Sequence, residues 1–280
     1  MNLRTLLLAI AFSTWAALAS AAQQNYQGLW WGGPSEAGWN INFSHQDDAI
    51  FALWATYDEA GKPTWLSMTA YQSAPDSFSG TLYRSSVAPF SIPPYDGSRL
   101  VLTAVGTADL VFESRTAGAF TYRIGDVQRT KSILRYDGGR PCSWSSPAAF
   151  STAVDHTDIW YADPAGAEPG WALAVYDVVS GFHLTWFTYD RDGSPTWSYT
   201  FVENIYGDFN WTSFLRTTGT SYLAQRFDPT SLTYKPVGGI YIEMLDNDRF
   251  RMIADGLLDR GWERTLTRYV YREGRTICAP

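Results

Sequence analysis

The apolar and polar positions of this chain alternate with a period of two. In residues 38–44 the apolar Trp39, Ile41 and Phe43 are separated by polar residues, and residues 170–176 show the same alternation of larger and smaller side chains. Successive side chains of a β-strand point to opposite faces, so this pattern predicts strands with one face toward a core. After the first two dozen residues no segment carries a convincing helical stripe. We therefore expect an all-β fold.

A duplication organises the chain. Residues 36–65 align without gaps with residues 168–197 at an offset of 132, and eleven of the thirty positions are identical. The shared residues are Glu36/Glu168, Gly38/Gly170, Trp39/Trp171, Trp54/Trp186, Thr56/Thr188, Tyr57/Tyr189, Asp58/Asp190, Gly61/Gly193, Pro63/Pro195, Thr64/Thr196 and Trp65/Trp197. Such self-similarity indicates two copies of one structural unit. We expect a first repeat over 23–140, a linker over 141–155 and a second repeat over 156–280.

Each repeat is expected to contain about eight short strands. In the first repeat the candidate strand segments are 28–31, 38–44, 49–57, 64–71, 78–85, 99–105, 107–113, 119–124 and 127–136. Sequential strands with short turns favour two tandem eight-stranded antiparallel up-and-down barrels, because closure leaves no exposed sheet edge. Two β-sandwiches are the alternative. A single 16-stranded outer-membrane barrel is disfavoured, because charges such as Arg123 and Arg264 fall where its lipid-facing band would lie.

The N-terminus has the pattern of a secretory signal peptide over residues 1–22. Arg4 precedes an apolar run from Leu6 to Leu18, and the small residues 19–22 follow, with cleavage expected near Ala21 or Ala22. The apolar run is too short for a membrane anchor, which needs roughly 20 residues. We therefore expect a periplasmic or secreted protein without a transmembrane segment after signal removal. The net charge of −7 argues against a nucleic-acid partner.

The chain has two cysteines, and each follows the last predicted strand of its repeat. Cys142 follows the strand that ends at residue 136, and Cys278 holds the corresponding place in the second repeat. In an oxidising compartment two cysteines pair more often than they stay free. A pseudo-twofold relation between the repeats would bring equivalent residues together near its axis. We therefore expect a Cys142–Cys278 disulfide, with two free thiols or an intermolecular link as the alternatives.

The duplicated segment resembles a repeat found in secreted bacterial proteins that have no established activity. Those proteins carry an E-S-G-W-G element followed by W-F-T-Y-D-x-x-G-x-P-T-W, and residues 186–197 match the second element at every fixed position. The first repeat departs from it at Ala55, and both repeats depart from the first element, with Ala37 and Pro169 in place of Ser. The resemblance implies export and a β-rich repeat, and it supplies no functional site.

The duplicated tryptophans and glutamates are the candidate ligand-binding residues. Trp39, Trp54 and Trp65, with Trp171, Trp186 and Trp197, could stack on a sugar or another planar ligand, or could fill the barrels. Trp39 and Trp171 lie on the apolar face of their strands, which favours the core, whereas Trp65 and Trp197 adjoin a turn and are better candidates for exposure. Glu36 and Glu168 could anchor a ligand, or could instead hold their own loops through backbone N–H groups. Asp58 and Asp190 open turns, and capping of the turn explains them.

A non-catalytic binding module for a small apolar or planar molecule or a sugar is the function that these features favour. The alternatives are a structural or protein-interaction component of the cell envelope, and a hydrolase using Glu36 or Glu168 with a neighbouring Asp. His45, His156 and His183 do not coincide between the repeats, and the usual metal, phosphate and nucleophile motifs are absent from the sequence. We therefore expect no cofactor and no metal, and either a small molecule or an envelope protein as the partner.

Overall fold

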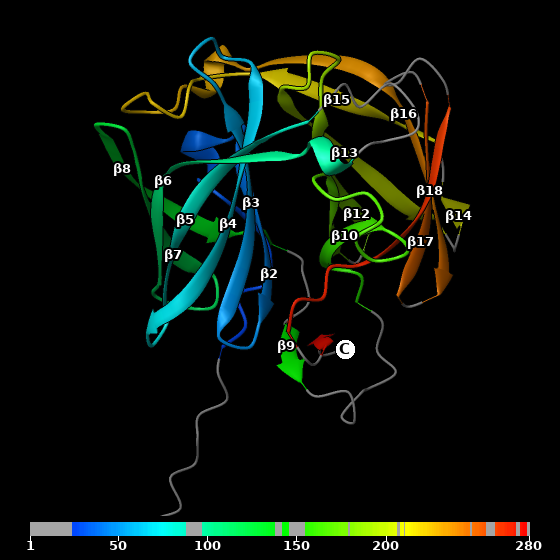
Figure 1. Ribbon diagram of the computed structural model, residues 1–280, viewed down its shortest axis with the longest axis horizontal. Coiled ribbons are helices and arrows are strands. Elements are labelled where there is room, and N and C mark those ends of the chain that lie inside the picture. The colour runs from blue at the N-terminus through cyan, green and yellow to red at the C-terminus, as the bar shows by residue number, and fades with distance from the viewer. Residues whose placement is uncertain are drawn as a thin grey trace, which may run out of the picture.

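The structure is a computed structural model that describes residues 24–87, 97–137, 142–145, 155–178, 180–205, 208–209, 211–246, 248–255, 261–272 and 275–278. The expectation of an all-β fold is confirmed (Figure 1). Short 3₁₀ turns occur at η1 (Pro34–Glu36), η2 (Gly97–Arg99) and η4 (Pro229–Ser231). The predicted signal peptide lies outside the described residues. Within those residues, no helix has the length and apolarity needed to cross a membrane.

The first repeat is a closed antiparallel barrel of eight strands in sequence order. The strands are β1 (Gly28–Trp31), β2 (Asn40–Gln46), β3 (Ala49–Tyr57), β4 (Pro63–Ala74), β5 (Ser77–Ser86), β6 (Val101–Phe112), β7 (Ala117–Ile124) and β8 (Val127–Arg135). The barrel closes where Trp30 and Trp31 of β1 pair with Arg135 and Leu134 of β8. The sequence predicted two strands over 99–105 and 107–113. They form the single strand β6, because the irregularity near Gly106 is a register shift between Leu82 and Tyr83 and not a turn.

The second repeat forms a ring of antiparallel strands that is less regular than the first barrel. Its strands are β10 (Asp158–Ala162), β11 (Ala172–Val178), β12 (Gly181–Tyr189), β13 (Pro195–Ile205), β14 (Asp208–Phe209), β15 (Thr212–Thr218), β16 (Thr233–Asp246), β17 (Arg249–Asp255) and β18 (Trp262–Arg268). Among the described residues, β13 and β15 share one registered pair, Tyr199 with Leu215. The equivalent strands β4 and β5 share five such pairs. The prediction of a second regular barrel is therefore met only as a ring of strands.

The predicted linker contains a strand. Within residues 141–155 the segment β9 (Cys142–Ser145) pairs antiparallel with β19 (Arg275–Cys278) near the C-terminus. In this two-stranded sheet Cys278 is the register partner of Cys142. The sheet lies below the two repeats in Figure 1 and joins the end of one repeat to the end of the other. The duplication therefore extends to the segments that follow each set of strands.

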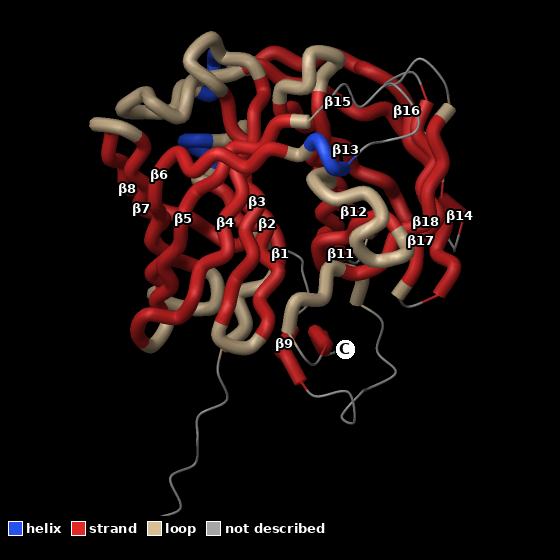
Figure 2. The backbone as a smooth tube through the Cα atoms, viewed as in Figure 1, coloured by secondary structure: helices blue, strands red, loops and turns tan. Residues whose placement is uncertain are grey.

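The two repeats lie side by side (Figure 2). Strands β3 and β12 are buried on both faces. In β3, Trp54 points into the barrel against Phe120 and Tyr122, whereas Phe51 on the opposite face contacts Tyr269 of the second repeat. Strands buried on both faces are nearly continuous apolar runs. This explains why β3 and β12 lack the alternation of β8, whose outer face is exposed. The interior of each repeat is filled with aromatic side chains.

Reciprocal hydrogen bonds show that the repeats are related by a pseudo-twofold. The indole N–H of Trp65 donates to the Thr188 carbonyl at 2.9 Å, and the indole N–H of Trp197 donates to the Thr56 carbonyl at 2.8 Å. All four residues belong to the duplicated motif. Trp65 corresponds to Trp197 and Thr188 corresponds to Thr56, so the two hydrogen bonds are equivalent under exchange of the repeats. The motif therefore builds the contact between the repeats.

The duplicated glycines serve the same contact. The backbone N–H of Gly219 donates to the Gly61 carbonyl at 3.1 Å, and that of Val87 donates to the Gly193 carbonyl at 3.3 Å. Gly61 and Gly193 have φ of 75° and 81°, and a Cβ on either would lie 2.8 Å from Gly219 O or 2.0 Å from Val87 O. Only glycine combines this backbone conformation with so close an approach of another chain segment.

Candidate functional site

Four of the six candidate tryptophans belong to the interiors of the repeats. Trp39 and Trp171 are buried, as their strand pattern predicted, and so are Trp54 and Trp186. The ring centroid of Trp262 lies 5.4 Å from that of Trp186 and 4.9 Å from that of Trp171. Large aromatic rings in such clusters contribute buried apolar area and favourable edge-to-face contacts. These tryptophans are explained by packing, although Trp171 also reaches a cavity described below.

Trp65 and Trp197 are not exposed. Their exposed fractions are 3% and 2%, because each lies under the opposite repeat with its indole N–H bonded across the interface. Proximity to a turn suggested exposure, but that turn itself packs against the other repeat. Trp65 and Trp197 therefore occupy equivalent positions, and their surroundings differ only where the two repeats have different residues.

Glu36 and Glu168 hold corresponding positions and form corresponding contacts. Glu36 accepts a hydrogen bond from the Trp39 indole at 3.2 Å and pairs with Lys131 at 2.9 Å. Glu168 accepts from Trp171 at 3.3 Å and pairs with Arg264 at 2.7 Å. Each carboxylate ties the loop before a strand to an indole and to a cation on the last strand of its repeat. These bonds explain both glutamates without a ligand.

Asp58 caps its turn, as the sequence predicted. Its carboxylate accepts hydrogen bonds from the backbone N–H groups of Ala60 and Lys62, both at 2.9 Å. The Asp190 carboxylate instead bonds the Arg216 guanidinium at 2.8 Å. Both aspartates hold turns that lie at the contact between the repeats, which is a structural role.

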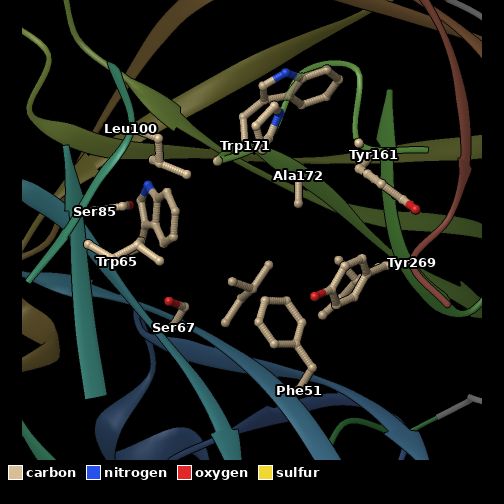
Figure 3. A pocket seen from close by; sticks show the side chains of 15 residues that line it. Phe51, Trp65, Ser67, Ser85, Leu100, Tyr161, Trp171, Ala172 and Tyr269 are labelled. Carbon is tan, nitrogen blue, oxygen red and sulfur yellow. The ribbon is translucent and has the colours of Figure 1, made fainter. Parts of the chain in front are cut away.

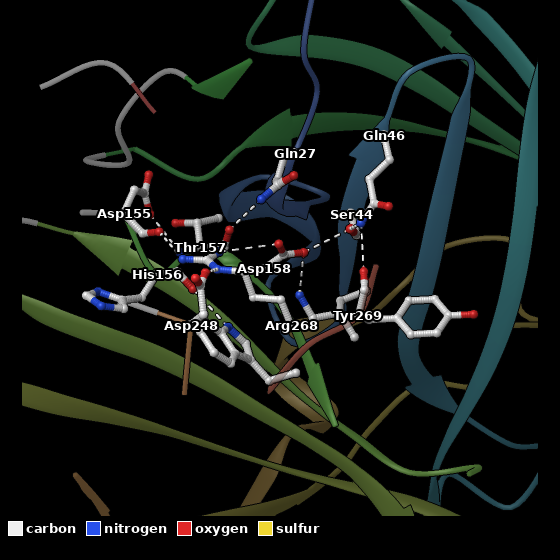
Figure 4. A network of polar contacts seen from close by, with 12 residues as sticks. Gln27, Ser44, Gln46, Asp155, His156, Thr157, Asp158, Asp248, Arg268 and Tyr269 are labelled. Carbon is white, nitrogen blue, oxygen red and sulfur yellow. Dashed lines mark hydrogen bonds and ion pairs between the residues drawn. The ribbon is translucent and has the colours of Figure 1, made fainter. Parts of the chain in front are cut away.

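A buried polar network crosses the interface near the N-terminal ends of β1 and β10 (Figure 4). The fully buried Asp158 accepts a hydrogen bond from Ser44 of the first repeat at 2.8 Å and pairs with Arg268 at 3.4 Å. Burial raises the pKa of Asp158, and the Arg268 charge opposes that shift. Gln46 donates to the Tyr269 carbonyl at 2.7 Å. Because these contacts link side chains of both repeats, the network fixes how the repeats dock.

His45 is held neutral beside this interface. Its ring Nδ1 accepts the backbone N–H of Tyr26 at 3.0 Å, and Nε2 lies 3.1 Å from the Asp47 carbonyl, which requires the proton on Nε2. Burial lowers the pKa of His45 to about 4, because the charged imidazolium would lose its hydration. No group of three or more His, Cys, Asp or Glu side chains in the described part of the chain could hold a metal ion.

A cavity of about 290 Å³ lies between the two repeats (Figure 3). The first repeat contributes Trp65, Ser67 and Ser85, and the second contributes Trp171 and Tyr269, among others. Besides the Tyr161 hydroxyl and backbone groups, the remaining lining is apolar and consists of Phe51, Leu53, Leu100, Leu102, Ile159, Tyr161, Gly166, Pro169, Gly170 and Ala172. Of the eight candidate site residues, the cavity brings together Trp65 and Trp171. We call it the inter-repeat cavity.

The pseudo-twofold explains why this cavity exists. Ser67 corresponds to Tyr199 at the offset of 132, and Phe51 corresponds to His183. In the opposite half of the interface the Tyr199 hydroxyl bonds the His183 ring, and the two rings stack at 5.9 Å. A serine in place of that tyrosine leaves the corresponding space open. The cavity is therefore a local departure from the symmetry that the duplicated motif imposes.

The sequence did not identify Ser67, Ser85 or Tyr269 as site residues. The signal that could have found the cavity is the difference between Ser67 and its counterpart Tyr199. No family model matches the chain, and comparisons with curated proteins and with solved structures give no match either. The function is therefore argued from the geometry of this chain.

Proposed function

We propose that this protein is an exported, non-catalytic binding module that holds a small, apolar, planar molecule in the inter-repeat cavity. The cavity itself carries the proposal, because aromatic and aliphatic side chains of both repeats line it. A dry apolar cavity of about 150 Å³ can bind benzene. A volume of about 290 Å³ therefore suits a molecule of about two fused rings. Trp65 and Trp171 supply flat faces for it.

Export is part of the proposal and rests on the signal-peptide pattern of residues 1–22. The cysteine register supports it. Directly opposite residues in an antiparallel pair have Cα atoms about 4.5–5.5 Å apart, which is within the range that a disulfide spans. Cys142 and Cys278 are such a pair. We therefore retain a Cys142–Cys278 disulfide, which forms in the periplasm or outside the cell.

A structural or protein-interaction role in the cell envelope is the second candidate. The aromatic filling of both repeat interiors favours it, because the duplicated tryptophans Trp54 and Trp186 need no ligand to explain them. A hydrolase is favoured by no observation. Glu36 and Glu168 do not line the inter-repeat cavity, and their carboxylates are occupied by indole and cation partners.

Native mass spectrometry on protein purified from the periplasm tests the proposal. Wild type is compared with Ser67→Tyr, which introduces the side chain that already occupies the equivalent position of the other repeat. A reproducible added mass on wild type that is lost on mild denaturation and absent from Ser67→Tyr is expected. An added mass that persists in Ser67→Tyr would place the ligand elsewhere. A bare mass on both proteins, with no uptake of an added two-ring aromatic, would favour the interaction role.

A further inference from the structure

We infer that the ligand of the inter-repeat cavity is an uncharged, flat molecule with a hydroxyl or carbonyl group at each end, and that Ser67 and Tyr269 bind these two groups from opposite repeats. The inference rests on the proposed function and specifies its ligand chemistry. None of the cavity-lining residues in the described part of the chain carries a charge, so an ionised ligand would lose its hydration there without a counter-charge. A two-ring diol is the simplest molecule of the required kind.

The Ser67 and Tyr269 hydroxyls are open to a ligand. Both residues line the cavity and stay partly exposed although they lie between the repeats. Neither hydroxyl has a hydrogen-bond partner within the described residues, and neither is among the fully buried polar atoms there that lack one, so both are accessible. Figure 3 shows the Tyr269 hydroxyl pointing toward the middle of the lining residues, whereas the Tyr161 hydroxyl points away from it. Burial raises the pKa of Tyr269, so its phenol keeps its proton and can donate or accept.

The two hydroxyls lie at the two ends of a wall that β3 forms. Ser67 of β4 is the register partner of Leu53, and the ring centroid of Tyr269 lies 4.7 Å from that of Phe51. Phe51 and Leu53 follow each other on one face of β3, which separates them by about 7 Å along the strand. This spacing is comparable with the length of two fused rings. A ligand lying along β3 therefore presents one end to Ser67 and the other to Tyr269.

The opposite half of the interface shows how a ring fits at this place. There the Tyr199 ring stacks on that of His183 at 5.9 Å and bonds it through the hydroxyl, and the Tyr136 ring lies 4.7 Å from His183. In the cavity half, Phe51 replaces His183 and Tyr269 replaces Tyr136, but the ring of Tyr199 has no counterpart. A ligand ring in that place stacks on Phe51, which has no ring nitrogen to accept a hydrogen bond. The polar groups of the ligand therefore depend on the hydroxyls at the two ends.

Calorimetric titration of the full mature chain with four naphthalene probes tests the inference. The probes are naphthalene, 2-naphthol, 2,6-naphthalenediol with its hydroxyls at opposite ends, and 2,3-naphthalenediol with both at one end. Wild type is expected to bind 2-naphthol about fivefold and 2,6-naphthalenediol about 25-fold more tightly than naphthalene, the effect of one and of two net hydrogen bonds. The 2,3 isomer is expected to bind no more tightly than 2-naphthol, because its second hydroxyl is buried without a partner.

Variants that remove one hydroxyl test each of the two residues. In Ser67→Ala and in Tyr269→Phe the advantage of 2,6-naphthalenediol over 2-naphthol is expected to disappear, whereas the affinity for naphthalene stays unchanged. Tyr136→Phe is the matched control, since it removes the corresponding hydroxyl outside the cavity, and it should leave all four affinities unchanged. The melting temperatures of Ser67→Ala and Tyr269→Phe should equal that of wild type, because neither hydroxyl bonds another described residue.

The outcomes separate this inference from the proposed function. Equal affinity of wild type for all four probes, with loss of binding in Ser67→Tyr, overturns the two polar contacts and leaves the apolar binding site standing. An advantage of 2,6-naphthalenediol that persists in Ser67→Ala or in Tyr269→Phe overturns the role of that residue, and tighter binding of the 2,3 isomer overturns the end-to-end arrangement. Failure of wild type to bind any probe overturns both proposals. A folded Ser67→Tyr that binds as well as wild type also overturns both, because the site would then lie outside the inter-repeat cavity.

Discussion

Substitution of Gly193 by alanine tests whether the duplicated motif holds the two repeats together. Gly193 has φ of 81°, and an added Cβ would lie 2.0 Å from the Val87 carbonyl oxygen of the other repeat. The left-handed conformation alone costs an alanine about 1–2 kcal/mol. Relief of the clash costs a further 1–3 kcal/mol or so, as in other overpacked sites. Loss of the Val87 N–H to Gly193 carbonyl bond adds about 1 kcal/mol.

Gly125 provides the matched control. It has φ of 55° in the turn between β7 and β8, and nothing lies within 4 Å of an added Cβ. Gly125→Ala therefore suffers the backbone cost without the clash, and we expect a loss of about 1–2 kcal/mol. Gly193→Ala is expected to lose about 3–6 kcal/mol. Urea unfolding of the mature protein measures both, with the slope of each transition checked for separate unfolding of the repeats. A loss in Gly193→Ala no greater than in Gly125→Ala would refute the close contact.

Three further predictions concern other parts of the structure. If Cys142 and Cys278 form a disulfide, neither should react with a thiol reagent in the unreduced, urea-unfolded protein, and both should react after reduction. Loss of this disulfide, which would close a loop of about 136 residues, should lower the free energy of unfolding by up to about 4–5 kcal/mol. Because burial lowers the pKa of His45 to about 4, its stabilising contribution is complete above the unfolded pKa of 6.5 and is lost as the pH falls toward 4. Urea midpoints measured across this range should fall by the equivalent of about 3 kcal/mol, and His45→Asn should remove most of that slope. Glu36→Gln should lower the free energy of unfolding by about 1–3 kcal/mol, since it leaves the largely buried Lys131 ammonium without its carboxylate, yet calorimetry should find 2-naphthol binding unchanged.

The strands and the duplication could be predicted because they depend on local patterns. The β2 strand and the Asp58 turn are visible in a short window of sequence, and the structure confirms both. The alternation in β2 suggested burial of one face, but the docking of the repeats buries its polar face as well. The division of residues 99–113 into two strands at Gly106 was wrong, because a register shift between paired strands looks like a strand break when one strand is read alone. Burial of Trp65 and Trp197 was missed for a related reason, since it depends on the docking of one repeat on the other.

The candidate site was harder to predict because it arises from a difference between the repeats. Residues shared by both copies, such as Glu36 with Glu168, proved to stabilise each repeat internally or to hold the repeats together. Nothing in the sequence around Ser67 marks it as a site residue. Its importance follows from the comparison with Tyr199, and the sequence pattern gives no reason to compare the two before the interface is known. The near-continuous apolar runs of β3 and β12 did contain a signal, because a strand exposed on one face would alternate.

The most direct test of the binding site is a crystal structure of the mature protein under xenon pressure, since xenon binds in dry apolar cavities. In wild type a xenon atom is expected in the inter-repeat cavity, in the space lined by Trp65, Trp171, Phe51 and Tyr269. In Ser67→Tyr the introduced tyrosine ring should fill the same position. Absence of xenon from this position in wild type, or ordered water filling it, would contradict an apolar ligand site between the repeats.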